Sequence, residues 1–163
     1  IYRELINISN EAGKKFILDT SGKALEDGIE AMPYLVKPNE GELEKLMGRT
    51  INSEEDIIDG ANYILNKGVE IVIVSLGKDG SMAFHKDKIY TIKVPNIKAV
   101  NPVGSGDAMI GGFAISLDKD YDFEYMLRFA TACGTANAME EETGKVSREN
   151  VEYIMDKVIV ISK

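Results

Sequence analysis

The 163-residue sequence has no tryptophan, one cysteine and one histidine, and no apolar run in it approaches the roughly 18 residues of a membrane span. One cysteine cannot form an internal disulfide, and one cysteine with one histidine cannot build a zinc site, so a reducing, cytoplasmic setting is expected. Positive charge is also scarce, because 19 Lys and Arg face 27 Asp and Glu and leave a net charge of −8. Nucleic acid, which needs clustered positive charge, is therefore excluded as a partner, and no membrane partner is expected.

The residues that are present have the composition of an ordinary globular domain, with 44% hydrophobic and 28% charged residues. A chain of this length usually folds as one domain and can bury a core without disulfides or structural metal. We therefore expect a single domain over residues 1–163. The chain begins at Ile1 rather than Met, and we expect its native start to lie further upstream.

Short apolar runs alternate with amphipathic stretches in the first half of the chain. The runs predict strands at 16–18, 34–36 and 71–74, and the amphipathic stretches predict helices at 1–13, 23–29, 40–47 and 54–66. In the first helix, one face is predicted to be apolar and carries Ile1, Leu5, Ile8 and Ala12. Residues 71–74 are apolar without interruption, which is typical of a strand at the parallel centre of an α/β sheet.

The second half of the chain has a different period. Apolar and polar residues alternate at 82–85 and 90–94, which predicts an antiparallel hairpin at the sheet edge, with His85 exposed. Helices are predicted at 105–117, at 123–141, where Cys133 is expected to be buried, and after Ser147. The alternation of strands and helices favours a layered α/β fold, with a central, mostly parallel sheet and helices on both faces.

The segment 101–114, Asn-Pro-Val-Gly-Ser-Gly-Asp-Ala-Met-Ile-Gly-Gly-Phe-Ala, is the strongest functional signal. Gly104, Ser105 and Gly106 allow a sharp turn that points consecutive backbone N–H groups outward at a helix start, where the helix macrodipole favours negative charge. This pattern indicates an anion hole, with the carboxylate of Asp107 beside the bound anion. Taken alone, the four residues Gly-Ser-Gly-Asp are also compatible with a flexible loop and a helix cap.

Two other phosphate-binding motifs are absent. The pair Gly-Lys occurs at Gly13, Gly22, Gly77 and Gly144, but neither Ser nor Thr follows, so there is no Walker A loop. The spacing that begins at Gly104 has Met109 where a dinucleotide fingerprint requires Gly or Ala.

The complete 101–114 segment resembles the second signature of the PfkB family of carbohydrate kinases, which have the ribokinase-like fold. Residues 39–42, Asn-Glu-Gly-Glu, look like the family's Asn-x-x-Glu motif, and residues 75–80 look like its nucleotide loop. Residues 19–22 and 37–39 are similar to the sugar-phosphate kinases of the family, which are 1-phosphofructokinases, 6-phosphofructokinases of the minor type and tagatose-6-phosphate kinases. Kinases of this family are about twice as long, so the resemblance covers their C-terminal, nucleotide-side half without the sugar-binding half and its lid.

The resemblance implies ATP-dependent phosphorylation of a ketohexose monophosphate, tagatose 6-phosphate or fructose 1-phosphate, to the 1,6-bisphosphate. It implies that Asp107 is the general base and that the amides of Gly104, Ser105, Gly106 and Asp107 stabilise the transferred charge. Asn39 and Glu42 would organise Mg²⁺ through water. A different interpretation makes Asn39 a helix N-cap and Glu42 its capping partner.

The resemblance also implies a set of nucleotide contacts, at Lys37, Asn39, Ser75, Leu76, Gly77, Lys78, Asp79, Gly80, Thr131 and Thr135. For Lys37 an exposed lysine beside a strand end is the alternative, and for residues 77–80 a tight turn. The alternative function is a non-catalytic nucleotide- or anion-binding module, or an inactive fragment. The isolated chain is expected to be inactive as a kinase and to self-associate through the surface that the other half would cover.

Overall fold

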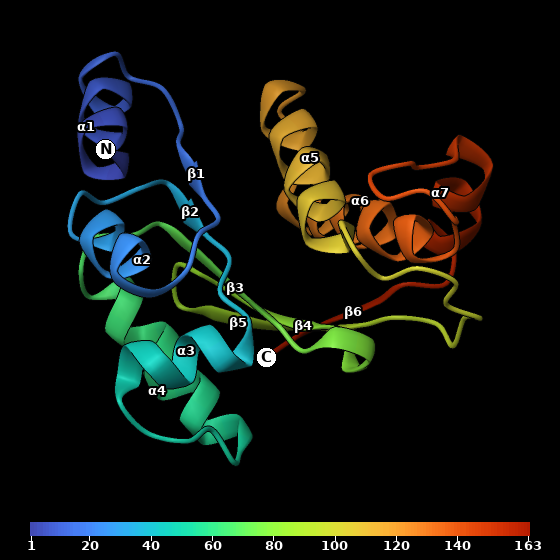
Figure 1. Ribbon diagram of the computed structural model, residues 1–163, viewed down its shortest axis with the longest axis horizontal. Coiled ribbons are helices and arrows are strands. Elements are labelled where there is room, and N and C mark those ends of the chain that lie inside the picture. Colours follow the sequence, from blue (N-terminus) through green and yellow to red (C-terminus); the bar gives the residue numbers. More distant parts are fainter. The chain divides into compact units, whose positions relative to one another are not determined.

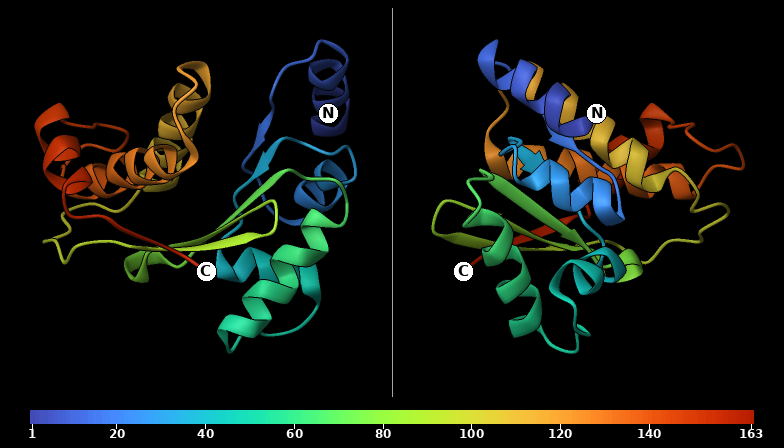
Figure 2. Two further views of the ribbon diagram at one scale, coloured as in Figure 1. Left: turned by 180° about the vertical axis from the view of Figure 1, so that it is seen from behind. Right: turned by 60° about the vertical axis from the view of Figure 1, so that its left-hand side comes forward.

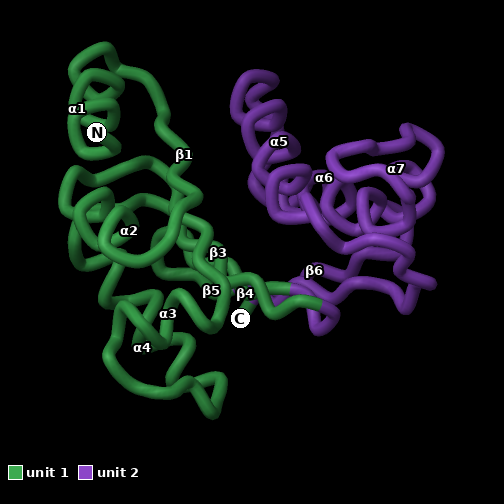
Figure 3. Tube along the Cα trace, viewed as in Figure 1, with its two compact units in different colours: residues 1–77, 81–89, 163 green, residues 78–80, 90–162 purple.

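A computed structural model describes residues 1–163, which form seven α-helices and six strands. Figure 3 shows that they make two compact units. Unit 1 comprises residues 1–77, 81–89 and 163, and unit 2 comprises residues 78–80 and 90–162. No helix is both long enough and apolar enough to cross a membrane.

Unit 1 alternates helices and strands in the predicted order (Figure 1). Its helices begin and end close to the predicted residues: α1 at Tyr2–Glu11, α2 at Gly22–Ile29, α3 at Glu40–Met47 and α4 at Glu54–Leu65. Its strands are β1 at Ile17–Leu18, β2 at Leu35–Val36, β3 at Ile71–Ser75 and β4 at Ser81–His85.

The strands of unit 1 are parallel up to β3 and antiparallel after it. Leu18 of β1 pairs with Val36 of β2, which pairs with Val72 of β3, and Val72 lies opposite Phe84 of the antiparallel strand β4. The first four residues of β3 are buried, as predicted. Its expected place in the middle of the parallel strands is wrong, because the connection over residues 76–80 is too short for the crossover that a parallel neighbour needs.

The helices of unit 1 bury one face of these strands in a single apolar core. The strands contribute every second residue, which places the contributing side chains on the same face. The core residues from the strands are Leu18, Val36, Val72, Val74, Met82 and Phe84. The helical residues that pack with them include Ile6, Leu25, Ile29, Leu43, Ile57 and Ile64.

Helix α1 packs on this core through a different face from the predicted one. Ile6 is fully buried, whereas Ile1, Leu5 and Ile8 are 91%, 47% and 62% exposed. These three residues form an apolar stripe that no residue of unit 1 covers, and we call it the α1 stripe. In the same unit, strand β1 pairs only with β2, so its other edge is unpaired.

Unit 2 contains α5 at Ser105–Asp118, α6 at Phe123–Ala138, α7 at Arg148–Met155, and the strands β5 at Lys88–Lys93, which begins in unit 1, and β6 at Ile159–Ser162. The C-terminal strand β6 pairs antiparallel with β5, so the predicted hairpin does not end the sheet. Helix α6 stops three residues before its predicted end. The carbonyl of Ala138 instead accepts hydrogen bonds from the N–H groups of Val100 and Asn101, at 2.7 and 3.1 Å.

Helices α5 and α6 lie against each other (Figure 2). Glycines at their contact allow this close approach. A Cβ on Gly112 of α5 would lie 2.6 Å from Ala130 Cα, and a Cβ on Gly134 of α6 would lie 2.8 Å from the Ser105 carbonyl oxygen. Gly112 therefore lets α5 approach α6 closely. Gly111 does not contribute to this contact, because it is exposed and has no atom within 4 Å of an added Cβ.

We expect Gly112→Ala to lower the free energy of unfolding by about 1–3 kcal/mol, because the added methyl group forces α5 away from the backbone of α6. The matched control is Gly111→Ala, in the same helix but in open space, which should stabilise the protein by up to about 1 kcal/mol through helix propensity. Urea unfolding followed by circular dichroism measures both values. Equal effects of the two substitutions would contradict the close packing.

Candidate functional site

The turn before α5 has the conformation that its glycine predicts. Gly104 is the N-cap of α5 and has a φ of +85°, a left-handed conformation that other residues rarely adopt. A Cβ on Gly104 would also lie 2.8 Å from Thr143 Cγ2 and 3.1 Å from the Gly144 nitrogen. Both the backbone conformation and the surrounding space therefore require glycine here.

The first turn of α5 leaves two backbone N–H groups unused. The N–H of Ser105 donates to the Pro102 carbonyl at 3.2 Å, while those of Gly106 and Asp107 have no hydrogen-bond acceptor. The Ser105 N–H is therefore not available to an anion, contrary to the predicted anion hole, because it forms a hydrogen bond within the turn. Free N–H groups at the positive end of a 14-residue helix can bind an anion.

Asp107 lies in the same turn and is exposed. Its carboxylate has neither a hydrogen bond nor an ion pair within the chain, so both of its oxygens are open to a ligand. The amides of Gly106 and Asp107 and this carboxylate thus occupy one turn of helix, beside the place where an anion would bind.

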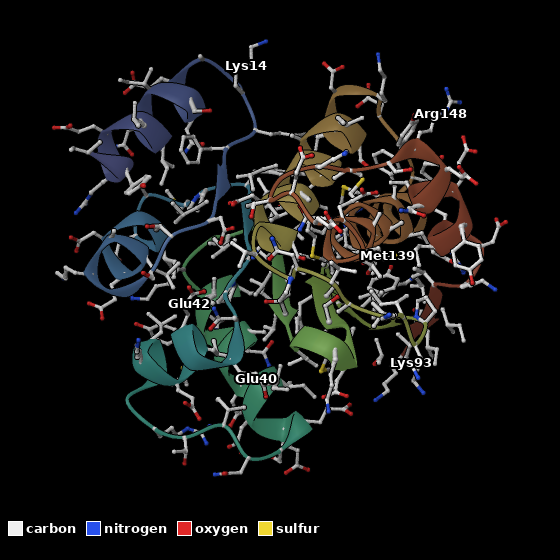
Figure 4. All side chains as sticks on the ribbon, turned by 45° about the vertical axis from the view of Figure 1, so that its right-hand side comes forward. Lys14, Glu40, Glu42, Lys93, Met139 and Arg148 are labelled. Carbon is white, nitrogen blue, oxygen red and sulfur yellow. The ribbon has the colours of Figure 1, made fainter.

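Asn101 holds the loop that leads into this turn. Its side-chain oxygen accepts a hydrogen bond from the Val103 N–H at 3.0 Å, and its side-chain nitrogen donates to the Glu141 carbonyl at 3.0 Å. These hydrogen bonds tie the loop before α5 to the segment that follows α6. Met139, labelled in Figure 4, is the first residue of that segment.

In unit 1, Lys37 and Asp19 form a largely buried ion pair. They directly follow the parallel strands β2 and β1, which brings both residues to the same edge of the sheet. The Lys37 Nζ lies 3.4 Å from Asp19 Oδ2, and the two side chains are 7% and 27% exposed. The alternative of an exposed Lys37 is therefore wrong. Asp19 also does not cap α2, whose N-cap is Ser21, and no side chain caps that helix.

Asn39 and Glu42 form a capping box at the start of α3, the helix on which Figure 4 labels Glu40 and Glu42. The Glu42 N–H donates to Asn39 Oδ1, and the Asn39 N–H donates to Glu42 Oε2, both at 2.9 Å. The structural interpretation of this pair is thereby confirmed. Glu42 Oε1 has no partner and is available to a ligand. Nowhere in the chain do three or more His, Cys, Asp or Glu side chains gather as a metal site.

The predicted nucleotide loop follows strand β3. The Ser75 N–H donates a hydrogen bond to the Pro38 carbonyl at 3.0 Å, and Ser75 also forms a parallel β-bridge with Asn39. After the half-buried Leu76, the exposed residues Gly77, Lys78 and Asp79 form one 3₁₀ turn. Gly80 ends the turn with a φ of +94°, and a Cβ there would collide with the carbonyl oxygen of Ile92. The turn is thus fixed by Gly80 and leaves Lys78 exposed.

The remaining residues singled out from the sequence lie in α6 and β4. Thr131 is 4% exposed, with a hydroxyl that has no hydrogen-bond partner, and Thr135, one turn later, is half-buried. Cys133 is buried as predicted, and burial raises the pKa of its thiol to about 11. His85 was expected to be exposed, but its side chain is only 15% exposed, beside Glu70, and burial lowers its pKa.

The predicted site residues therefore form two groups. Direct contacts in unit 1 join Asp19 with Lys37, Asn39 with Glu42, and Asn39 with Ser75. Unit 2 holds the group formed by Gly104, Ser105, Gly106 and Asp107, together with the two threonines of α6.

The family of this chain follows from its match to the model of the pfkB family carbohydrate kinases over residues 1–150. The chain belongs to that family, and the resemblance seen in its three motifs is confirmed.

Solved structures of kinases share its fold. A candidate phosphofructokinase from Staphylococcus aureus is 32% identical with a TM-score of 0.92, over 99% of this chain and 52% of that chain. Phosphofructokinase-2 from Escherichia coli, in complex with potassium, is 30% identical with a TM-score of 0.89, over 96% of this chain and 51% of that chain. Ribokinase from Arabidopsis thaliana, complexed with ribose and ATP, is 25% identical with a TM-score of 0.84, over 94% and 51%.

These structures confirm the predicted ribokinase-like α/β fold. The chain spans about half the length of the relatives that it matches.

We expect Asp19→Asn to lower the free energy of unfolding by about 2–3 kcal/mol, because it leaves the buried Lys37 ammonium without a counter-charge. Replacing both partners, as Asp19→Asn with Lys37→Met, should recover much of that loss. The matched control is Asp27→Asn, which breaks the exposed ion pair with Lys23 and should have little effect. Urea unfolding of the four variants, Lys37→Met included, gives the coupling free energy. A coupling near zero would show that Asp19 does not compensate the charge of Lys37.

Proposed function

We propose that this chain is the nucleotide-side part of an ATP-dependent sugar-phosphate kinase. The acceptor would be a ketohexose monophosphate, tagatose 6-phosphate or fructose 1-phosphate, and the product its 1,6-bisphosphate. The observation that carries the proposal is the first turn of α5, where an unpaired Asp107 carboxylate adjoins two free N–H groups. A reducing, cytoplasmic location is part of the proposal and agrees with a single, buried cysteine.

Phosphoryl transfer requires a group that accepts the proton of the attacking hydroxyl. Asp107 fills this role in the proposal, because its carboxylate is exposed and committed to no other partner. As the sugar oxygen bonds to the γ-phosphorus, the bond from that phosphorus to the β–γ bridging oxygen breaks. The hydroxyl proton passes to Asp107, and ADP leaves.

The N–H groups at the start of α5 stabilise the negative charge of the transferred group. Those of Gly106 and Asp107 are unused, and the turn at Gly104 sets their direction. Preorganised backbone donors of this kind lower the barrier without any rearrangement during the reaction. No Walker A lysine is needed in this arrangement.

The groups of unit 1 serve the nucleotide phosphates and Mg²⁺ in the proposal. Bound Mg²⁺ would neutralise phosphate charge, and Glu42 Oε1 is the free carboxylate oxygen that could hold one of its waters. Asn39 Oδ1 already accepts the Glu42 N–H, so Asn39 would act by holding Glu42 in place. Lys37 would neutralise phosphate charge from beside Asp19. Residues 75–80 would contact the nucleotide, and Thr131 and Thr135 would border the adenine.

Two observations support a phosphorylated ketohexose as the acceptor. Residues 19–22 and 37–39 are similar to sugar-phosphate kinases. Phosphofructokinase-2 from Escherichia coli, 29% identical, was solved in complex with fructose-6-phosphate, a ketohexose monophosphate. Competition among sugars addresses this part of the proposal, since preferred turnover of ribose would contradict it.

In the complete kinase, with both halves of the fold, we expect Asp107→Asn to lower kcat by at least about 100-fold, because the acceptor hydroxyl loses its base. The affinity for ATP should change little. Asp118→Asn, in the last turn of the same helix and exposed, is the matched control and should keep the wild-type kcat. Steady-state kinetics measures both variants.

Near-wild-type turnover by Asp107→Asn would remove Asp107 as the base. A wild-type protein that binds ATP but turns over no sugar phosphate would instead favour the alternative, a non-catalytic nucleotide-binding module.

The isolated chain is proposed to be inactive and to self-associate. Its unpaired β1 edge and the α1 stripe are apolar or hydrogen-bonding surfaces that unit 1 leaves uncovered. Phosphofructokinase-2 from Escherichia coli was solved in a tetrameric form, which supports self-association as a property of the relatives.

We expect the purified 163-residue chain to form dimers or larger species, and the double substitution Leu5→Glu with Ile8→Glu to shift it towards monomer, because charged side chains cannot be buried in a contact between copies. Tyr153→Glu, on the exposed face of α7, is the control and should not change the assembly. Sedimentation velocity gives the masses. A stripe variant that assembles like the wild type would place the contact elsewhere.

A further inference from the structure

The amide side chain of Asn137 is buried beside the start of α5 and is not one of the predicted site residues. It lies one residue before the end of α6, is 0% exposed, and interrupts a run of small residues. A fully buried polar side chain is costly unless hydrogen bonds satisfy it, so its contacts should reveal its purpose.

Two of the three contacts of Asn137 go to the start of α5, and the third goes to the segment that follows α6. Its Nδ2 donates to the Val103 carbonyl at 2.9 Å and to Ser105 Oγ at 3.3 Å. Its Oδ1 accepts a hydrogen bond from the Gly144 N–H at 2.8 Å. One side chain therefore ties the last residues before α5 to the end of the segment that follows α6.

Two of these contacts come directly before the two free N–H groups in the sequence. Val103 and Ser105 lie on either side of Gly104, whose left-handed conformation turns the chain into α5, and the Gly104 Cα packs against Thr143 and Gly144. The hydrogen bond to Val103 fixes the peptide that enters this turn. It acts together with the side-chain hydrogen bonds of Asn101 and the hydrogen bond from the Ser105 N–H to Pro102, which also hold this loop. Loss of the Asn137 contact would therefore leave the directions of the Gly106 and Asp107 N–H groups less well fixed.

We propose that Asn137 is a positioning residue for the anion hole: its buried amide holds the backbone of Val103–Ser105 so that the Gly106 and Asp107 N–H groups point at one anion. This inference rests on the proposed function of the same turn. It adds Asn137, which lies 30 positions after Asp107 in the sequence. The affinity of the turn for an anion would depend on this residue, although its side chain does not contact the anion.

The test uses the ¹⁵N-labelled 163-residue chain and inorganic phosphate as the probe, read from the backbone amide signals of Gly106 and Asp107. In the wild type both signals should shift with one dissociation constant. In Asn137→Ala we expect that constant to rise about tenfold or more, the effect of losing roughly one hydrogen bond to a charged group. Asn137→Ser, too short to reach both Val103 and Gly144, is the second variant if the alanine variant does not fold, with the same expected rise.

The matched control is Asn150→Ala. Asn150 is a partly buried asparagine in α7, and its Nδ2 donates to Glu140 Oε1 at 3.0 Å, so it contacts the same connecting segment but not the turn before α5. This variant should lower the melting temperature without changing the dissociation constant for phosphate. If the role of Asn137 were purely structural, its variants would behave like this control. Their melting temperature would fall, and their dissociation constant for phosphate would stay the same.

The outcomes separate the two proposals. If the wild-type Gly106 and Asp107 signals do not respond to phosphate, the anion hole itself is wrong, and the role of Asn137 falls with it. If the wild type responds and a folded Asn137 variant binds phosphate equally well, the anion hole stands and the positioning role is overturned. An equal loss of affinity in Asn150→Ala would also overturn it.

Discussion

The distance between α5 and α6 is the constraint on which the candidate anion site depends. Gly112 and Gly134 let the two helix backbones meet with no side chain between them, and Gly134 faces the carbonyl oxygen of Ser105 in the first turn of α5. Because the contact is backbone to backbone, the start of α5 is fixed relative to α6. The end of α6 can then supply a side chain to the loop before α5, and Asn137 does so.

In unit 1 the corresponding constraint is the parallel pairing of short strands. Two residues each in β1 and β2 suffice to bring Asp19 and Lys37 into contact, because parallel strands end at the same edge of a sheet. Lys37 is only 6% exposed, and the carboxylate of Asp19 beside it offsets part of the cost of burying its charge. In the proposed function, Lys37 would meet phosphate with Asp19 already beside it, which weakens its attraction for the phosphate.

Local patterns were enough to predict most elements and the turn before α5. Glycines, capping residues and apolar periodicity act over a few residues, so the cap at Asn39 and the turn at Gly104 could be assigned from the sequence alone. The errors concern interactions between distant segments. The end of α6 depends on Val100 and Asn101, whose N–H groups donate hydrogen bonds to the Ala138 carbonyl. The burial of Lys37 depends on strand β1, which ends 19 residues earlier in the sequence.

The candidate site shows the same division. Gly104, Gly106 and Asp107 were predictable because one short motif contains them. The motif does not show that the Ser105 N–H donates a hydrogen bond to the Pro102 carbonyl and is unavailable to an anion. Asn137 could have been suspected from its position, as an asparagine in a stretch of Ala, Gly and Thr. Its partners could not, since they lie more than 30 residues away or beyond the end of the helix.

The division of the chain also affects how it folds. Except for residues 78–80, unit 2 is one continuous stretch, and the contacts of α5 with α6 and of α6 with α7 join neighbours in the sequence. Such local contacts close short loops at little entropic cost, which favours rapid folding. The strands of unit 2 differ from its helices in this respect, because Tyr90 of β5 pairs with Ser162 of β6, a wider sequence separation than in any strand pair of unit 1. The helices of unit 2 can therefore pack early, whereas its two strands pair only once residues 159–162 are available.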